Sequence, residues 1–150
     1  MEITDTAGQD QFSTPKERWI READGLLILF DVNKKESFYE LESLMEYIAE
    51  INPSAPKILF GNKSKFFALK GFFLALLNIL LALVDDTSKR REVDTKQAKK
   101  FGQSSFCLDY LEGSALKNVN VQEAFHRLIL EVDNARSFPP KKQRKKCCIF

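Results

Sequence analysis

Cys147 is the residue whose type and position predict the most definite reaction in this sequence. It begins the segment Cys-Cys-Ile-Phe at residues 147–150 and follows the basic run Lys-Lys-Gln-Arg-Lys-Lys at residues 141–146. A cysteine in this C-a-a-X arrangement is a substrate for prenyl transfer, and Phe at the last position favours a geranylgeranyl group. One lipid chain anchors only marginally, and neighbouring basic residues add about 1 kcal/mol each near an anionic leaflet. The sequence therefore predicts a prenylated tail, residues 138–150, on an anionic membrane surface.

Three further polar segments follow one another in a fixed order along the chain. They are Asp-Thr-Ala-Gly-Gln at residues 5–9, Gly-Asn-Lys-Ser at 61–64 and Glu-Gly-Ser-Ala at 112–115. Together with the C-terminal cysteine box, they resemble the motifs of the Ras superfamily of small GTPases, of the Ras or Rab type. The resemblance implies GTP binding and hydrolysis as a signalling or trafficking switch at the cytoplasmic face of the plasma membrane or an endomembrane.

The resemblance also implies a role for each residue that matches a motif. Asp5 would hold Mg²⁺ through a water, Gly8 would offer its backbone N–H to the γ-phosphate, and Gln9 would orient the attacking water. The implied ligands are thus GTP or GDP with Mg²⁺, and the implied partners are GTPase regulators or effectors. The residues implied on the guanine side are Asn62, Lys63, Ser114 and Ala115.

The sequence departs from the family pattern at the phosphates and at the base. No G-x-x-x-x-G-K-[ST] motif occurs in the 150 residues, so no nest of N–H groups and no lysine cradles the phosphates. Lys65 stands where the family has a base-reading Asp, Gly113 replaces a Thr and Leu116 replaces a Lys. The sequence therefore predicts impaired GTP binding and hydrolysis and leaves enzymatic activity undecided. The alternatives are a non-catalytic, membrane-tethered interaction protein and a mis-spliced or incomplete product.

An apolar block at residues 66–84 matches no motif of the family. It has nineteen residues and a single charge, Lys70. Three hypotheses compete: a transmembrane helix, a core helix that is apolar all round, and an insertion foreign to the fold. The insertion, at about residues 65–84, is favoured because its removal would join residues 62–64 to Asp85 and restore Asn-Lys-Ser-Asp.

Hydrophobic periodicity predicts alternating strands and helices around these motifs. The continuous apolar run at residues 25–30 is typical of a strand buried on both faces of a parallel sheet. Residues 94–97 have the spacing of a capping box and predict the start of a helix. A polar loop is expected from Ala7 to about Glu22. Strands are predicted at 1–4, 25–30, 57–60 and 106–111, and helices at 36–51, 95–103 and about 121–132.

This alternation predicts an α/β fold with a parallel sheet and helices on both faces. By resemblance, it is an incomplete P-loop-NTPase-type sheet that lacks its N-terminal strands. The family's sheet order, 2-3-1-4-5-6, places the absent first strand at the centre. Residues 25–31 are therefore expected to keep an unpaired apolar edge, which is a template for aggregation or for a partner's strand.

Composition is consistent with one partial small GTPase domain, residues 1–137, followed by the tail. The chain is 44% hydrophobic and 29% charged, which is ordinary for a globular protein. The net charge is +2, and residues 141–146 alone contribute five positive charges, so the rest of the chain is net negative. This argues against a nucleic-acid-binding body. A basic run can also be a nuclear-localisation signal, but its position beside Cys147 favours the membrane.

Three cysteines are too few for a disulfide framework, as expected for a protein in a reducing cytosol.

Overall fold

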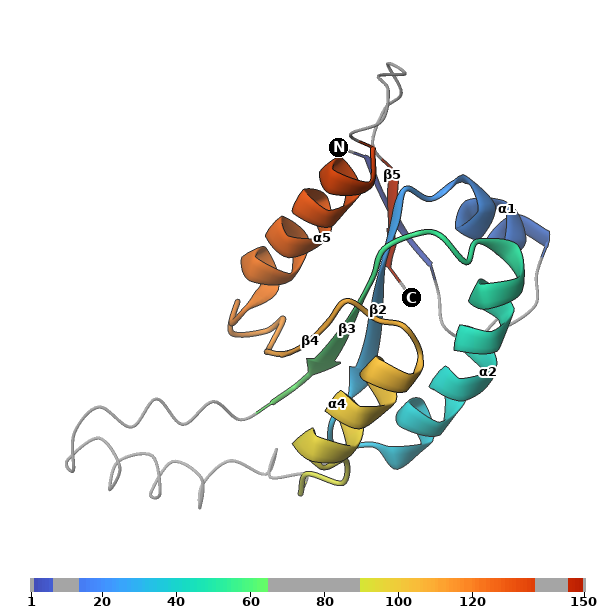
Figure 1. Cartoon of the computed structure of the whole chain (residues 1–150). Coiled ribbons are helices and arrows are strands. Elements are labelled where there is room, and N and C mark those ends of the chain that lie inside the picture. The colour runs from blue at the N-terminus through green and yellow to red at the C-terminus, as the bar shows by residue number, and fades with distance from the viewer. Residues whose placement is uncertain (1, 7–13, 65–89, 137–145, 150) are drawn as a thin grey trace.

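The computed structural model describes residues 2–6, 14–64, 90–136 and 146–149. Within these ranges, five strands form one parallel sheet in the order β1-β5-β2-β3-β4 (Figure 1). The α/β class and the parallel sheet flanked by helices are confirmed. The strands are β1 Glu2–Asp5, β2 Gly25–Asp31, β3 Lys57–Asn62, β4 Asp109–Glu112 and β5 Lys146–Ile149. The helices are α1 Thr14–Glu22, α2 Lys35–Ile51, α4 Thr95–Ser104 and α5 Val121–Ala135.

Strand β2 divides the apolar core into two layers because its side chains alternate between the faces of the sheet. Leu26, Ile28 and Phe30 pack into the layer that holds α1, α2 and α4. Leu27 packs on the opposite face, with Leu128 of α5. Figure 1 shows this division, with α5 on one side of the sheet and α1 and α2 on the other. Helices thus cover both faces, as the sequence predicts.

The three predicted helices are present close to their expected bounds. Helix α2 presents one buried stripe with helical spacing, and α5 is held by Ala124, Leu128 and Val132. Helix α4 begins at the predicted cap, where the Asp94 carboxylate accepts a hydrogen bond from the backbone N–H of Lys96 at 3.0 Å. The buried residues of α2 are Phe38, Leu41, Met45 and Ile48.

The expected loop from Ala7 to Glu22 is wrong in its second half, where α1 forms. Two ion pairs with i,i+4 spacing, Glu17 with Arg21 and Arg18 with Glu22, lie along the exposed side of this helix. Ile20 anchors the other side, since it is fully buried in the layer that contains α2. One buried apolar residue in a short polar segment is too weak a periodicity to predict a helix.

The predicted strand at 106–111 begins three residues late. The residues that follow α4 form a turn, in which the backbone N–H of Cys107 donates to the carbonyl of Gly102 at 2.9 Å. Phe106 adopts the left-handed conformation, with φ 57°, and is 87% exposed. This turn is a common way for a helix to end, and it uses residues whose apolar character predicts a strand.

The prediction that residues 25–31 keep an unpaired edge is wrong for Gly25–Leu27. These residues pair with Cys147–Ile149 of β5, which lies between β1 and β2. By resemblance, this central position belongs to the strand that carries the family's phosphate loop. The sequence predicts residues 138–150 as a tail outside the domain, whereas residues 146–149 are a strand of its sheet.

The apolar block at residues 65–84 lies outside the described residues. The three hypotheses about this block therefore stay predictions. Among the helices that the structure does describe, none is both long and apolar enough to cross a membrane.

Candidate functional site

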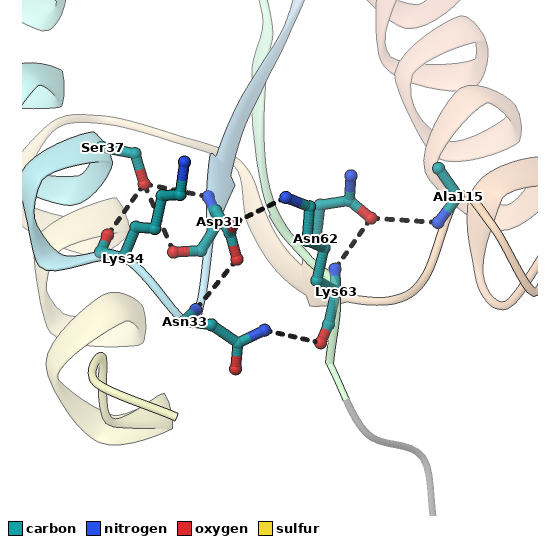
Figure 2. A network of polar contacts seen from close by, with 7 residues as sticks. All are labelled: Asp31, Asn33, Lys34, Ser37, Asn62, Lys63 and Ala115. Carbon is teal, nitrogen blue, oxygen red and sulfur yellow. Dashed lines mark hydrogen bonds and ion pairs between the residues drawn. The ribbon is translucent and has the colours of Figure 1, made fainter. Parts of the chain in front are cut away.

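Polar side chains gather where β2 and β3 end, since parallel strands bring their carboxyl ends to one edge of the sheet. Asp31 and Asn62 are the last residues of these strands and lie opposite each other in the register. The side-chain oxygen of Asn62 accepts two backbone hydrogen bonds, from Lys63 at 2.8 Å and from Ala115 at 3.0 Å (Figure 2). The end of β3 is thereby fixed to the loop that follows β4.

Asp31 organises the other half of this network. One carboxylate oxygen lies 2.7 Å from the Lys63 ammonium, and the other accepts the backbone N–H of Asn33 at 3.0 Å (Figure 2). Lys63 has a left-handed backbone, with φ 64°. Its carbonyl accepts a hydrogen bond from the Asn33 side chain at 3.3 Å, which helps to hold this conformation. The Lys63 ammonium is therefore engaged within the protein.

The loop after β4 is tied to β3 through backbone atoms as well. The Ser64 hydroxyl, which is buried, donates to the carbonyl of Gly113 at 2.9 Å. The N–H of Gly113 donates to the carbonyl of Gly61 at 2.9 Å, and Ser114 bridges back to Val119. The Ser114 hydroxyl accepts the N–H of Lys117 at 3.2 Å. The Ser114–Ala115 segment is consequently held in one conformation against β3.

Gly113 lies at a position where only glycine fits. The sequence has glycine here, where the family has Thr, and a side chain at this position would clash with its neighbours. A Cβ at Gly113 would lie 2.3 Å from the carbonyl oxygen of Val119 and 2.5 Å from Phe60. We expect Gly113→Ala to lower the free energy of unfolding by about 1–3 kcal/mol, as for other overpacked sites. Urea unfolding followed by circular dichroism measures the change.

Gly102 provides the matched control for this substitution. A Cβ there meets its nearest neighbour, Leu59, at an ordinary contact distance of 3.4 Å within α4. Gly102→Ala is expected to raise stability by about 0.5–1 kcal/mol, since alanine is favoured in helices. Equal effects of the two substitutions would contradict the crowding inferred at Gly113.

A second polar cluster lies behind this loop, around Glu112. Arg91 binds the Glu112 carboxylate through two nitrogens, at 2.9 and 2.5 Å, and the Tyr110 hydroxyl donates to it at 2.6 Å. Burial acts to raise the pKa of Glu112, but the hydrogen bonds from Arg91 and Tyr110 outweigh it and keep that pKa below its usual value. Burial and the same carboxylate raise the pKa of Tyr110, so its hydroxyl stays protonated. The cluster fixes the segment before α4 to the end of β4.

This cluster predicts a loss of stability in acid. Because the pKa of Glu112 is lower in the folded than in the unfolded chain, its contribution is present above the unfolded pKa of about 4.3. The contribution is lost as the pH falls through the folded pKa. Urea unfolding between pH 7 and pH 3 should show a smaller acid-induced loss for Glu112→Gln than for the unmodified chain. An unchanged pH slope would contradict a role for this carboxylate.

The structure brings together only part of the predicted site. Asn62 and Lys63 lie beside the Ser114–Ala115 segment, as the resemblance implies. Asp5 is exposed at the end of β1, and β5 and β2 lie between it and Asn62. Three strand spacings put them about 14 Å apart across the sheet. Gly8 and Gln9 lie outside the described residues, and Cys147 lies in β5.

On the base side of this arrangement, one donor group has no partner among the described residues, and one acceptor of the family pattern is missing from the sequence. Among the described residues, the side-chain N–H₂ of Asn62 has no hydrogen-bond acceptor (Figure 2). Lys65, at the position of the base-reading Asp, has donors only and cannot accept from the guanine edge. The described ranges contain no cluster of three or more His, Cys, Asp or Glu residues that fits a metal ion.

Sequence reasoning missed the residues that support Asn62 and Lys63. Asp31 comes directly after a buried strand, and a polar residue at the carboxyl end of such a strand is the signal that would have found it. Ser37 has no comparable signal, although its hydroxyl accepts the N–H of Asp31 at 3.0 Å and donates to the carbonyl of Lys34 at 2.8 Å (Figure 2).

The parallel sheet, with helices on both faces and a polar loop cluster at its carboxyl edge, defines a protein of the α/β class, in which ligands bind beyond the carboxyl ends of the strands. A sequence model of the Ras family matches residues 1–134. The chain is 32% identical to Ras-like protein RAS2 of Hydra vulgaris, over 99% of this chain and 69% of that protein. It is 30% identical to the human Ras-related protein R-Ras, over 97% of this chain and 60% of that protein. Ras-like protein 2 of Mucor circinelloides is 27% identical over 99% of this chain. The chain belongs to the Ras family.

Proposed function

We propose that this chain acts at the cytoplasmic face of a membrane as a Ras-type switch protein whose GTP binding and hydrolysis are impaired. Membership in the Ras family implies guanine nucleotide and Mg²⁺ as ligands. The observation that supports impaired GTP binding is the difference between the base side and the phosphate side of the site. Asn62 and Ala115 form an ordered base-side loop, whereas no phosphate-loop motif occurs in the 150 residues.

The proposed anchor is a prenyl group on Cys147, supported by the basic residues at 141–146. In this reaction the Cys147 thiol loses its proton, the sulfur forms a thioether with the first carbon of an isoprenyl diphosphate, and inorganic diphosphate leaves. The basic residues then bind the anionic leaflet. The proposed partners are this membrane surface and the protein regulators or effectors of a GTPase.

A non-catalytic interaction protein is the second candidate. The observation that favours it is the ion pair between Lys63 and Asp31, because it occupies a lysine that the resemblance assigns to the guanine pocket. In this case, the body would bind protein partners without a nucleotide cycle. Titration with GTP and GDP separates the two candidates, and the distribution of a tail-bearing reporter tests the anchor.

A further inference from the structure

Strand β5 is the element that joins β1 to the rest of the sheet. Its four residues, Lys146–Ile149, pair with Glu2–Asp5 on one side, and Cys147–Ile149 pair with Gly25–Leu27 on the other. In the described part of the chain, β1 has no other strand neighbour. The space between β1 and β2 therefore accepts an extended segment that runs parallel to both.

Packing on both faces supports the placement of β5. Ile149 is half-buried against the apolar layer under α5, which includes Leu27 and Leu128. Its carbonyl accepts the N–H of Thr6, a buried residue, at 3.1 Å. Helix α1 contacts β5 from the opposite face. Ile149 thus packs against the core, and the backbone of β5 belongs to the hydrogen-bond ladder.

Helix α5 lies close to the sheet at the level of Cys147. Cys147 pairs in register with Gly25, and a Cβ at Gly25 would lie 2.7 Å from Val132 and 3.0 Å from Leu128. At this position the backbone of β5 has a strand on each side and a helix packed over the sheet. An enzyme that must bind residues 147–150 as a free extended peptide cannot do so while both edges of β5 are hydrogen-bonded to neighbouring strands.

We propose that the space between β1 and β2 is a binding site for an extended parallel peptide, and that residues 146–149 of the same chain occupy it. While these residues are in the sheet, a lipid cannot be attached to Cys147. The consequence for lipidation rests on the proposed function, but the occupancy does not. The chain then has two exclusive states, one with the strand inserted and one with the tail released. If only one molecule in a hundred has a released tail, modification of Cys147 slows about a hundredfold.

A disulfide at the adjacent register position tests this inference in the full chain. Thr4 is level with Cys148, and neighbouring strands have the spacing that a disulfide requires. In a Thr4→Cys, Cys107→Ser variant, oxidation should join positions 4 and 148 and leave Cys147 as the free thiol. N-ethylmaleimide should then alkylate Cys147 at least about tenfold more slowly than in the reduced form, as measured by peptide mass spectrometry.

The matched control is Glu2→Cys in the same background, because Glu2 is level with Lys146. It should form little disulfide with Cys148. Equal yields from the two variants, no disulfide within one chain, or unchanged alkylation of Cys147 after oxidation would each overturn the inference. A disulfide between two chains would assign the site to the tail of a second copy and overturn occupancy by the same chain.

Hydrogen exchange of the unmodified chain provides a second measurement that needs no substitution. The amides of residues 146–149 should exchange more slowly than in the isolated tail peptide, and equal rates would overturn the inference. Incubation of the reduced chain with geranylgeranyl diphosphate and a prenyltransferase tests the anchor separately. Failure of that reaction on the isolated tail peptide would count against lipidation at Cys147. The disulfide and hydrogen-exchange results would still decide whether residues 146–149 occupy the space between β1 and β2.

Discussion

The 150-residue chain is expected to show no saturable binding of GTP or GDP at micromolar concentrations. A phosphate cradle supplies about six charge-assisted hydrogen bonds at roughly 1.5–3 kcal/mol each. Even with heavy discounting, the absence of these bonds weakens binding by about 10⁵-fold or more, since each 1.4 kcal/mol is about tenfold. The base side adds to the loss, because Lys65 cannot accept hydrogen bonds from the guanine edge.

Isothermal titration, with a fluorescent GTP analogue as a second assay, measures this binding in the presence of Mg²⁺ and after its chelation. Asn62→Ala is the informative variant, because it removes the side chain that the structure orders between β3 and the Ser114–Ala115 segment. Micromolar binding that requires Mg²⁺ and is weakened by Asn62→Ala would contradict the proposed impairment. Weak binding that Asn62→Ala leaves unchanged would be nonspecific.

Substitution of Cys147 by Ser is expected to move a tail-bearing reporter from membranes to the cytosol. The reporter carries residues 138–150 fused to a fluorescent protein, so that neither the sheet nor the apolar block takes part. Without the prenyl group, only the basic residues remain, and stable attachment generally needs two signals. Neutralising the five basic residues at 141–146 should weaken or redirect attachment for the same reason. Cell fractionation and fluorescence microscopy measure the distribution.

Cys148→Ser is the control for this experiment, since the proposed lipid is on Cys147 alone. Its reporter should stay on membranes. A Cys147→Ser reporter that remained membrane-bound would rule out prenylation at this cysteine as the anchor. Release by both substitutions would show that the second cysteine also contributes.

The sequence predicts those parts of the fold whose signals are local. The apolar run at residues 25–30 identifies β2, because a strand covered on both faces must be apolar throughout. The spacing of apolar residues in α2 and α5 is equally local. Residues 146–149 gave no such signal, because they follow a basic run and their pairing depends on two strands far away in the chain. Their place in the sheet is determined by the space between β1 and β2.

The candidate site shows the same division. Asn62, Lys63, Ser114 and Ala115 could be found from motifs, and the contact between Asn62 and Ala115 follows from the meeting of parallel strand ends. The ion pair between Asp31 and Lys63 could not be found, because its members are separated by 32 positions and neither belongs to a pattern with the other. Asp5 was assigned to Mg²⁺ by resemblance alone, and its role stays a prediction, since β5 and β2 separate its strand from β3.

The pairing of β1 with β5 also has a consequence for how the chain folds during its synthesis. The hydrogen bond from the side chain of Thr6 to the carbonyl of Ile149 spans 143 positions. The sheet therefore cannot close until residues 146–149 have been synthesised, and contacts of such long range slow folding. At about 5–20 residues per second, the edge of β2 stays open for about 6–24 seconds while the rest of the chain is made. During that time, the nascent chain is expected to depend on chaperones that bind exposed strand edges.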